Sequence, residues 1–298
     1  MKLLCIGKSG QVAKALAERS AVAGLDCVCL GRPELDVLRE DQVAAALDRE
    51  APTLVVNAAA YTNVDGAEND RGAAYALNAD AVGTLAELCV ARDLPLIHLS
   101  TDYVFDGSGN TPWRETDPTG PRNVYGASKL AGEETIRAAG GTHVILRTSW
   151  VYSPFGGNFI KTMLRLAHEQ AGASVVDDQF GSPTSALDIA DTILAIAARI
   201  ARQSTAGLSG TYHYSAAGFA SWADVAAMIF EIYEQRCGCK IKLKRIPSSD
   251  YPTPAERPRN SRLNTDKITE TFGVVPQDWR LTVKQTVERL LDEKEDSR

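Results

Sequence analysis

The alternation of short apolar segments with longer helical stretches is the feature that most constrains the fold of this chain. In the first half, apolar segments rich in β-formers lie at residues 2–6, 26–30, 53–57, 94–100 and 143–149. Helical patterns fill residues 11–23, 40–49, 70–92 and 128–138 between them. Apolar runs without strict polar alternation suit strands that are covered on both faces. The alternation therefore predicts the α/β class, with a doubly wound parallel (Rossmann) sheet and right-handed crossovers.

The pattern changes after Val151, where loops rich in glycine, proline, serine and asparagine separate helices from isolated strands. We expect the helix from Leu187 and a strand at residues 211–215 to return to the main sheet. The predicted dinucleotide-binding domain therefore comprises residues 1–152 and 184–215. The predicted smaller, discontinuous C-terminal substrate lobe comprises residues 153–183 and 216–298.

The composition argues against several classes of protein. The 298 residues carry a formal net charge of -6 without a basic tract, so we expect neither nucleic acid nor an anionic membrane as a partner. The apolar start breaks at Gly7, too early for a secretory signal, and charged residues interrupt the apolar stretch at 187–201. The six cysteines lack the spacing of common zinc or redox motifs. These features predict a cytoplasmic protein with reduced cysteines.

A short glycine motif directly follows the first apolar segment and opens a helical pattern. It reads Gly7-Lys-Ser-Gly10-Gln11-Val12. Because Gly7 and Gly10 lack side chains, the backbone can turn tightly and approach a pyrophosphate, whose charge the helix N-terminus favours. Its place at the first strand-to-helix turn predicts dinucleotide binding. The alternative is a glycine-rich turn that serves packing alone.

The second apolar segment ends next to Arg32, where the ribose of the cofactor should lie. Sites that prefer NAD usually have an acidic residue there, whereas a nearby arginine can pair with the 2′-phosphate of NADP. Arg32 therefore favours NADPH over NADH. The alternative is a solvated arginine at a strand end.

The strongest chemical signal is the pair Tyr125 and Lys129, in a YxxxK arrangement. At helical spacing both side chains lie on one face. Because an adjacent ammonium favours the phenolate, we expect Lys129 to lower the pKa of Tyr125 into a range useful for acid–base catalysis. The pair alone occurs by chance in many helices. Upstream, however, Ser100 and Thr101 end the fourth strand, where ligands bind in such sheets and a hydroxyl can hydrogen-bond a reacting carbonyl.

Longer blocks of sequence carry a resemblance to a known family. They are VVNAAAYTNVDGAE at 55–68, HLSTDYVFDGSGNTPWRETDPTGPRNVYGASKLAGE at 98–133, LRTSWVYSPFGGNF at 146–159, DQFGSPTS at 178–185 and RPRNSRLNTDK at 257–267. With these blocks the chain resembles, almost from end to end, the dTDP-4-dehydrorhamnose reductases of the extended short-chain dehydrogenase/reductase superfamily. The last three blocks are typical of this family in particular.

The resemblance implies a reaction and roles for three residues. NADPH or NADH would deliver hydride to C4 of dTDP-4-dehydro-β-L-rhamnose, giving dTDP-L-rhamnose in the last step of dTDP-rhamnose biosynthesis. Tyr125 would protonate the nascent alkoxide. Lys129 would lower the pKa of Tyr125 and hold the nicotinamide ribose. Thr101 would hydrogen-bond the reacting carbonyl.

Further site residues follow from positions that match the motifs of the family. Besides Gly7, Arg32, Tyr125 and Lys129, the predicted cofactor-binding residues are Gly10, Gln11, Val12, Asp36, Val37, Ala60, Tyr61 and Thr62. Besides Thr101, the predicted substrate-binding residues are Asp102 and Trp150, with Val64 and Asn158 as weaker candidates. For Trp150 the alternative is a core aromatic at a strand end.

The sequence departs from the family at one kind of site. Some relatives bind magnesium at a dimer interface through glutamates on the first helix and after the PT motif. Ala15 and Leu187 stand at those places here, and neither can supply a hard oxygen ligand. We therefore predict no metal site, doubt a magnesium-bridged dimer, and expect a monomer or a weak homodimer.

Two other functions compete with reduction by a dTDP-sugar reductase. One is a sugar-nucleotide epimerase or dehydratase on the same scaffold, which would recycle its hydride and consume no net NADPH. The other is a non-catalytic binding protein, similar to the regulatory subunit of methionine adenosyltransferase. The presence of Thr101, Tyr125 and Lys129 argues against the binding protein.

Overall fold

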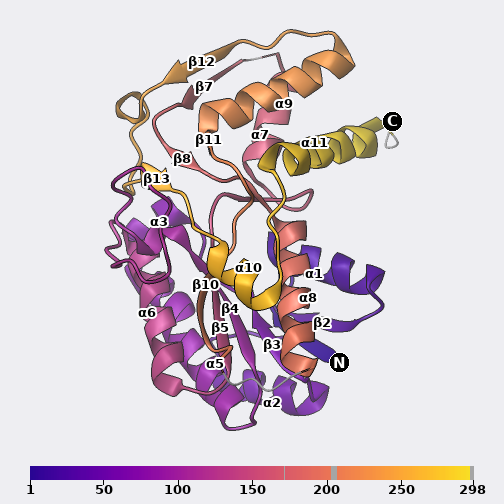
Figure 1. Cartoon of the computed structure of the whole chain (residues 1–298), viewed down its shortest axis with the longest axis vertical. Helices are drawn as coiled ribbons and strands as arrows, with labels where there is room; N and C mark the ends of the chain where they lie inside the picture. The colour runs from indigo at the N-terminus through magenta and orange to yellow at the C-terminus, as the bar shows by residue number, and fades with distance from the viewer. Residues whose placement is uncertain (171, 203–206, 296–298) are drawn as a thin grey trace.

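The main sheet is parallel throughout. The structure is a computed structural model that describes residues 1–170, 172–202 and 207–295. Within these ranges, six strands form the sheet in the order β10-β5-β4-β3-β1-β2 (Figure 1). This order confirms the predicted doubly wound α/β fold. The strands are β1 (Lys2–Ile6), β2 (Asp26–Leu30), β3 (Leu54–Asn57), β4 (Leu96–Thr101), β5 (His143–Thr148) and β10 (Gly210–His213).

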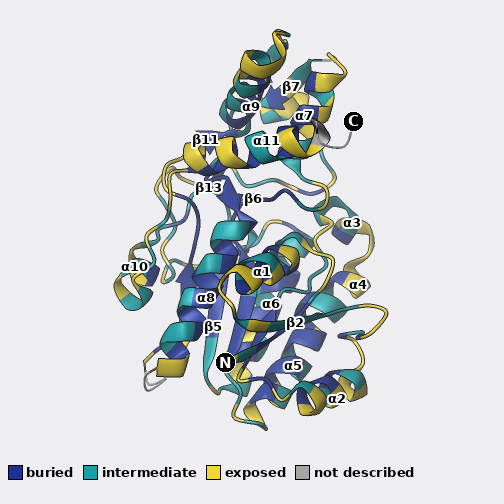
Figure 2. Cartoon of the chain, turned by 90° about the vertical axis from the view of Figure 1, so that its right-hand side faces the viewer, coloured by how far each residue is buried: buried dark blue, intermediate teal, exposed yellow. Residues whose placement is uncertain are grey.

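Helices cover both faces of this sheet. One face packs against α1 (Gln11–Val22) and α8 (Ala186–Arg202), and the other against α2 (Glu40–Glu50), α5 (Ala81–Val90) and α6 (Val124–Ala139). Along β1, Leu3 and Cys5 face the first layer, whereas Leu4 and Ile6 face the second. Figure 2 shows the central strands buried between helices whose outer sides are exposed, whereas the edge strand β2 is only partly buried. Burial on both faces explains why the strands are continuous apolar runs in the sequence.

A second hydrophobic core lies at the end of the molecule opposite α2 and α5 (Figure 1). Its helices are α7 (Phe159–His168), α9 (Trp222–Cys237) and α11 (Trp279–Glu295). Short strands join it: β7 (Ala173–Val176) with β12 (Leu243–Ile246), β6 (Val151–Tyr152) with β9 (Thr184–Ser185), and β8 (Phe180–Gly181) with β11 (Ala220–Ser221) and β13 (Asn260–Ser261). None of the helices in the described ranges has the length and apolar character needed to span a bilayer.

The last part of the chain contributes to both cores. Helix α10 (Asp266–Phe272) falls in the range predicted for the substrate lobe, yet its Ile268 is buried in the core of the main sheet beside Tyr212 of β10. Helix α11 then returns to the second core, where Val283 and Val287 are buried.

Two helix boundaries differ from the prediction. Helix α6 begins at Val124 rather than at residue 128, because the side chain of Asn123 caps it and accepts a hydrogen bond from Gly126 N–H at 2.8 Å. The stretch 70–92 is not one uniform helix. It contains α4 (Arg71–Tyr75), a π-helical segment η1 (Ala76–Asp80) and α5. The extra residue of a π-helical turn lets Asn78 face α6, and Asn78 Nδ2 donates to Ser128 Oγ at 2.9 Å.

Helix α6 approaches its neighbours at glycines. A Cβ atom at Gly132 would lie 2.0 Å from the carbonyl oxygen of Asn78, and one at Gly126 would lie 2.2 Å from that of Tyr103. Both neighbours are backbone atoms, which side-chain rotation cannot remove. The two glycines therefore set the distance of α6 from η1 and from the segment that follows β4.

We predict that Gly132→Ala destabilises the protein by about 1–3 kcal/mol or more, because the methyl group overpacks a backbone contact. Gly72→Ala is the matched control, since a Cβ there meets nothing within 4 Å. Its helical position should change stability by less than about 1 kcal/mol, in the stabilising direction. Urea unfolding followed by circular dichroism measures both. Equal small effects would mean that α6 can shift to accept a methyl group.

Candidate active site

The carboxyl end of β4 and the first turn of α6 bring together the hydroxyl groups of Thr101 and Tyr125. Thr101 is the last residue of β4, and its Oγ1 donates to Asp102 Oδ1 at 3.1 Å and accepts from Tyr103 N–H at 3.2 Å. The rings of Tyr103 and Tyr125 pack edge to face, with centroids 5.5 Å apart. This contact fixes the plane of the Tyr125 ring beside the end of the strand.

The pKa of Tyr125 is raised, which corrects the prediction made from its spacing to Lys129. Burial is the main cause, the negative charge of Asp102 adds to it, and the interaction with the Thr101 hydroxyl opposes it. An uncharged phenol is favoured in such surroundings. Tyr125 is therefore held as a protonated acid at neutral pH.

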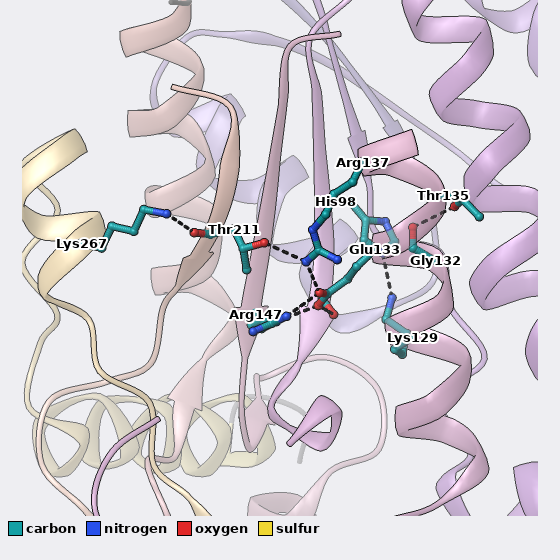
Figure 3. A network of polar contacts seen from close by, with 10 residues as sticks. His98, Lys129, Gly132, Glu133, Thr135, Arg137, Arg147, Thr211 and Lys267 are labelled. Carbon is teal, nitrogen blue, oxygen red and sulfur yellow. Dashed lines mark hydrogen bonds and ion pairs between the residues drawn. The ribbon is translucent and has the colours of Figure 1, made fainter. Parts of the chain in front are cut away.

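Lys129 contacts β4 in this structure. Its Nζ donates to the carbonyl oxygen of Leu99 at 2.7 Å and lies 3.2 Å from His98 Nε2 (Figure 3). Burial lowers the pKa of Lys129 to about 8, although the nearby Glu133 carboxylate raises it. A lysine without a close counter-ion loses its charge more readily in such a place.

Asp102 has a carboxylate oxygen available for a ligand. Its side chain is buried, and Oδ2 has no hydrogen bond of good geometry among the described residues, although the Ser261 hydroxyl lies near enough to lower the Asp102 pKa. Burial raises its pKa to about 7. A buried acceptor without a donor is costly unless something else supplies one. The oxygen is therefore suited to accept a hydrogen bond from a substrate hydroxyl.

Glu133 connects this part of α6 to the strands β4 and β5 through hydrogen bonds. Its buried carboxylate accepts from Arg147 Nε at 2.8 Å and Nη2 at 2.6 Å, from Ser100 Oγ at 2.6 Å and from Arg137 Nη2 at 2.7 Å (Figure 3). Burial raises the pKa of Glu133, but the hydrogen bonds and charge of Arg147 outweigh it, so the net shift is downward. The hydroxyl of Ser100 is thus used inside the protein.

The glycine turn fits a dinucleotide cofactor. Gly7 has φ of 129°, a conformation that favours glycine, and a Cβ there would lie 3.1 Å from the Ala58 carbonyl carbon. At Gly10 a Cβ would meet nothing within 4 Å. Gly10 is also the N-cap of α1 and provides no side-chain cap, so no cap side chain occupies the first N–H groups of the helix. Gln11 and Val12 form the first turn of this helix. Such a surface suits a pyrophosphate.

The residues predicted to contact the adenosine ribose lie after β2. Arg32 is exposed, and its Nε is 3.6 Å from Asp36 Oδ2. The backbone N–H of Asp36 donates to Gln42 Oε1 at 2.8 Å, and Val37 is buried in the core of the second layer. Arg32 therefore has room to turn toward an anion, whereas Val37 mainly packs.

The segment after β3 is held by a residue that the sequence did not suggest. Asn78 Oδ1 accepts from Tyr61 N–H at 2.8 Å, and its Nδ2 donates to the Tyr61 carbonyl at 3.1 Å. This pairing fixes the backbone of the predicted cofactor residues Ala60, Tyr61 and Thr62. Val64 begins α3 (Val64–Asn69) behind the N-cap Asn63. Asn78 was detectable only as a polar residue inside an apolar helical pattern.

Asn158 and Gln11 bind each other, which the sequence did not predict. Asn158 Oδ1 caps α7 by accepting from Lys161 N–H, and its Nδ2 donates to Gln11 Oε1 at 3.0 Å. Gln11 Oε1 also accepts from Ser153 Oγ at 2.8 Å. Their polar side-chain atoms thus connect the glycine turn to the segment that leads into the second core.

Trp150 lies against a second tryptophan. It has φ of 51°, and its ring stacks on Trp222 with centroids 3.7 Å apart and an interplanar angle of 10°. A Cβ at Gly181 would lie 2.6 Å from the Trp150 ring. Trp150 is only half-buried, so part of the ring remains available to a ligand. Trp222, at the start of α9, was not predicted as part of the site.

The described residues contain no group of three or more histidine, cysteine, aspartate or glutamate side chains that could hold a metal ion. Ala15 is fully buried in α1, and Leu187 packs against the same core.

Comparisons with known proteins agree on one family. The family model described as the RmlD substrate binding domain matches residues 1–292. A dTDP-4-dehydrorhamnose reductase of Sinorhizobium fredii is 46% identical over 297 residues, covering 100% of both chains. A crystal structure of such a reductase from Clostridium acetobutylicum has a TM-score of 0.90 at 31% identity, covering 98% of this chain and 100% of that one.

A further structure, a dTDP-4-dehydrorhamnose reductase from Bacillus anthracis in complex with NADP, has a TM-score of 0.87 at 32% identity, with 98% of this chain and 100% of that chain covered. The matches extend over nearly the whole sequence, and they confirm the resemblance carried by its motifs. The chain therefore belongs to the dTDP-4-dehydrorhamnose reductase family.

Proposed function

We propose that this protein uses NADPH to reduce the C4 ketone of dTDP-4-dehydro-β-L-rhamnose, giving dTDP-L-rhamnose in the last step of dTDP-rhamnose biosynthesis. The observation that carries the proposal is the pairing of Tyr125 on α6 with Thr101 at the end of β4, beside a glycine turn that fits a dinucleotide. The names of the relatives, at up to 46% identity over the full chain, support the substrate.

The protein's own residues divide the work of reduction. When bound at the glycine turn, NADPH supplies the hydride. Tyr125 supplies the proton that the nascent alkoxide requires, since its raised pKa keeps it protonated. The Thr101 hydroxyl, which donates to Asp102 Oδ1 in this structure, turns to donate to the oxygen on which charge develops. Asp102 Oδ2 accepts from a sugar hydroxyl, and the exposed part of Trp150 packs against the sugar.

We propose that the cofactor and the sugar nucleotide bind to different parts of the chain, which correspond to the two cores. Residues 1–152 and 184–215 hold the cofactor, and residues 153–183 and 216–298 hold the sugar nucleotide. Helix α10 is the exception, because its Ile268 belongs to the core of the main sheet. Asn158 acts in this proposal as a link between the two parts, and Val64 as a minor contact.

We further propose that the protein acts in the cytoplasm as a monomer or a weak homodimer. Ala15 and Leu187 support the proposed oligomeric state, because apolar side chains there cannot provide carboxylates for a magnesium ion that bridges two subunits.

The direct test is net oxidation of NADPH. When dTDP-glucose is converted by the upstream dehydratase and epimerase, adding this protein should consume NADPH in proportion to the substrate formed, followed by absorbance. An epimerase or dehydratase would change the sugar without net consumption, and that outcome would contradict the proposal.

Tyr125→Phe should reduce turnover by roughly 10²–10⁴-fold, the usual effect of losing a positioned acid, and leave NADPH affinity nearly unchanged. Tyr75→Phe is the matched control, because its hydroxyl lies on α4 and accepts from the Arg71 side chain at 3.3 Å. Turnover and fluorescence titration with NADPH measure the two effects. Wild-type turnover in Tyr125→Phe would refute the role of this phenol.

Arg32→Ala should weaken NADPH binding by roughly tenfold or more while changing NADH binding little, because one charge-assisted contact to the 2′-phosphate is lost. Arg39→Ala removes another exposed arginine, paired with Asp41 at 3.2 Å, and should affect neither cofactor. Titrations of the variants with both cofactors provide the comparison. Equal losses for NADPH and NADH in Arg32→Ala would eliminate the 2′-phosphate contact.

A further inference from the structure

A chain of three buried polar side chains lies behind Tyr125. Asn57 at the end of β3, His98 on β4 and Lys129 on α6 are exposed by 1%, 0% and 2%. Asn57 and His98 are register partners in the sheet, and Asn57 Nδ2 lies 3.1 Å from His98 Nδ1. Lys129 Nζ lies 3.2 Å from the other ring nitrogen, His98 Nε2 (Figure 3). Each group must satisfy its hydrogen bonds within the protein.

The orientation of the Asn57 amide is fixed by the backbone. Its Oδ1 accepts a hydrogen bond from Ala59 N–H at 3.1 Å, so the NH2 group must face His98. Asn57 Nδ2 can only donate. His98 Nδ1 must therefore be the acceptor, and a neutral imidazole then carries its proton on Nε2.

The proton on Nε2 determines the state of Lys129. Nε2–H points at Lys129 Nζ, which must accept it, and only a neutral amine has the required lone pair. The amine in turn donates to the Leu99 carbonyl at 2.7 Å. Each hydrogen bond from Ala59 N–H to the Leu99 oxygen then joins one donor to one acceptor.

The alternative with a charged Lys129 leaves a donor unpaired. An ammonium would require Nε2 as an acceptor, so Nδ1 would carry the proton and Asn57 would have to present Oδ1 to it. The Asn57 NH2 group would then face Ala59 N–H, at a cost of about 1–3 kcal/mol for the unsatisfied buried donor. A doubly protonated ring is disfavoured as well, because burial lowers the pKa of His98 well below its usual value.

Burial lowers the pKa of Lys129 to about 8, so the neutral amine becomes accessible near neutral pH and predominates above that pKa. The ionised group that acts on it is Glu133, one turn along α6, which favours the ammonium. The Glu133 charge is already matched by Arg147 from β5 and by Arg137. Burial outweighs the remaining attraction.

We propose that Asn57 and His98 are positioning residues that hold Lys129 as a neutral amine against β4, with His98 Nε2–H donating to Nζ. The importance for catalysis rests on the proposed function and on the role that the family resemblance implies for Lys129, which is to hold the nicotinamide ribose and to lower the pKa of Tyr125. In this arrangement of Asn57, His98 and Lys129, the lysine becomes protonated only when its side chain leaves β4. The tautomer itself does not depend on the reaction.

Long-range 1H–15N NMR correlations of the full-length protein, labelled at histidine and free of cofactor, report the tautomer directly. The chain has four histidines, and the signals lost in His98→Gln identify those of His98. We expect the Nε2–H form for His98. His213 is an internal control of equal burial, because its Nδ1 lies 3.1 Å from the Trp113 carbonyl and must carry the proton. An Nδ1–H form of His98 overturns the proposal.

Asn57→Asp tests whether the Asn57 amide determines the tautomer of His98. It replaces the NH2 donor by an acceptor while keeping the acceptor for Ala59 N–H, so His98 should change to the Nδ1–H form. Lys129 should then become an ammonium, and its titration, followed through the lysine 13Cε signal, should rise by at least about one pH unit. Asn110→Asp adds the same charge at an exposed loop and should change neither signal.

An unchanged tautomer or an unchanged Lys129 titration in Asn57→Asp refutes the coupling. If that variant does not fold, the wild-type tautomer decides alone. Because both measurements use the protein without cofactor or substrate, their failure is distinguishable from a failure of the reductase assay.

Discussion

The buried ion pair between Glu133 and Arg147 is the interaction on which the geometry of the site depends. A carboxylate with no exposed surface is costly to bury, and here four hydrogen bonds from β4, β5 and α6 offset that cost. Removing one partner of such a pair typically costs about 3–5 kcal/mol, because the other charge is left uncompensated. Lys129 and Tyr125 lie one and two turns before Glu133 on the same helix. The pair therefore sets the face of α6 that is presented to the end of β4.

The same principle of matched polar groups connects the two cores. Gln11 belongs to the glycine turn, yet its side chain binds Ser153 and Asn158, which lead into α7. Hydrogen bonds of the Gln11 side chain thereby link the turn to the segment that leads into the second core. Directional bonds of this kind hold one relative arrangement, whereas apolar contacts alone tolerate sliding.

Local patterns in the sequence predicted the elements, and long-range contacts determined what the local patterns missed. Apolar runs located the strands, because both faces of a parallel sheet are buried. The spacing of Tyr125 and Lys129 placed them on one helix face. The pKa of Tyr125 was predicted wrongly, because burial and Asp102 act on it, and neither is visible in a four-residue window. Likewise, the contact of Asn57 with His98 exists only through the register of β3 against β4.

Burial and neighbouring charges together set the protonation states of the site. Burial works against isolated charge, and it keeps Tyr125 and His98 neutral while lowering the pKa of Lys129. Glu133 stays ionised only because two arginines surround it. The raised pKa keeps Tyr125 protonated, so the phenol carries the proton that a nascent alkoxide needs, but the same shift makes it a weaker acid. The environment of Tyr125, and not the bare presence of a tyrosine and a lysine, therefore sets the protonation state from which it acts.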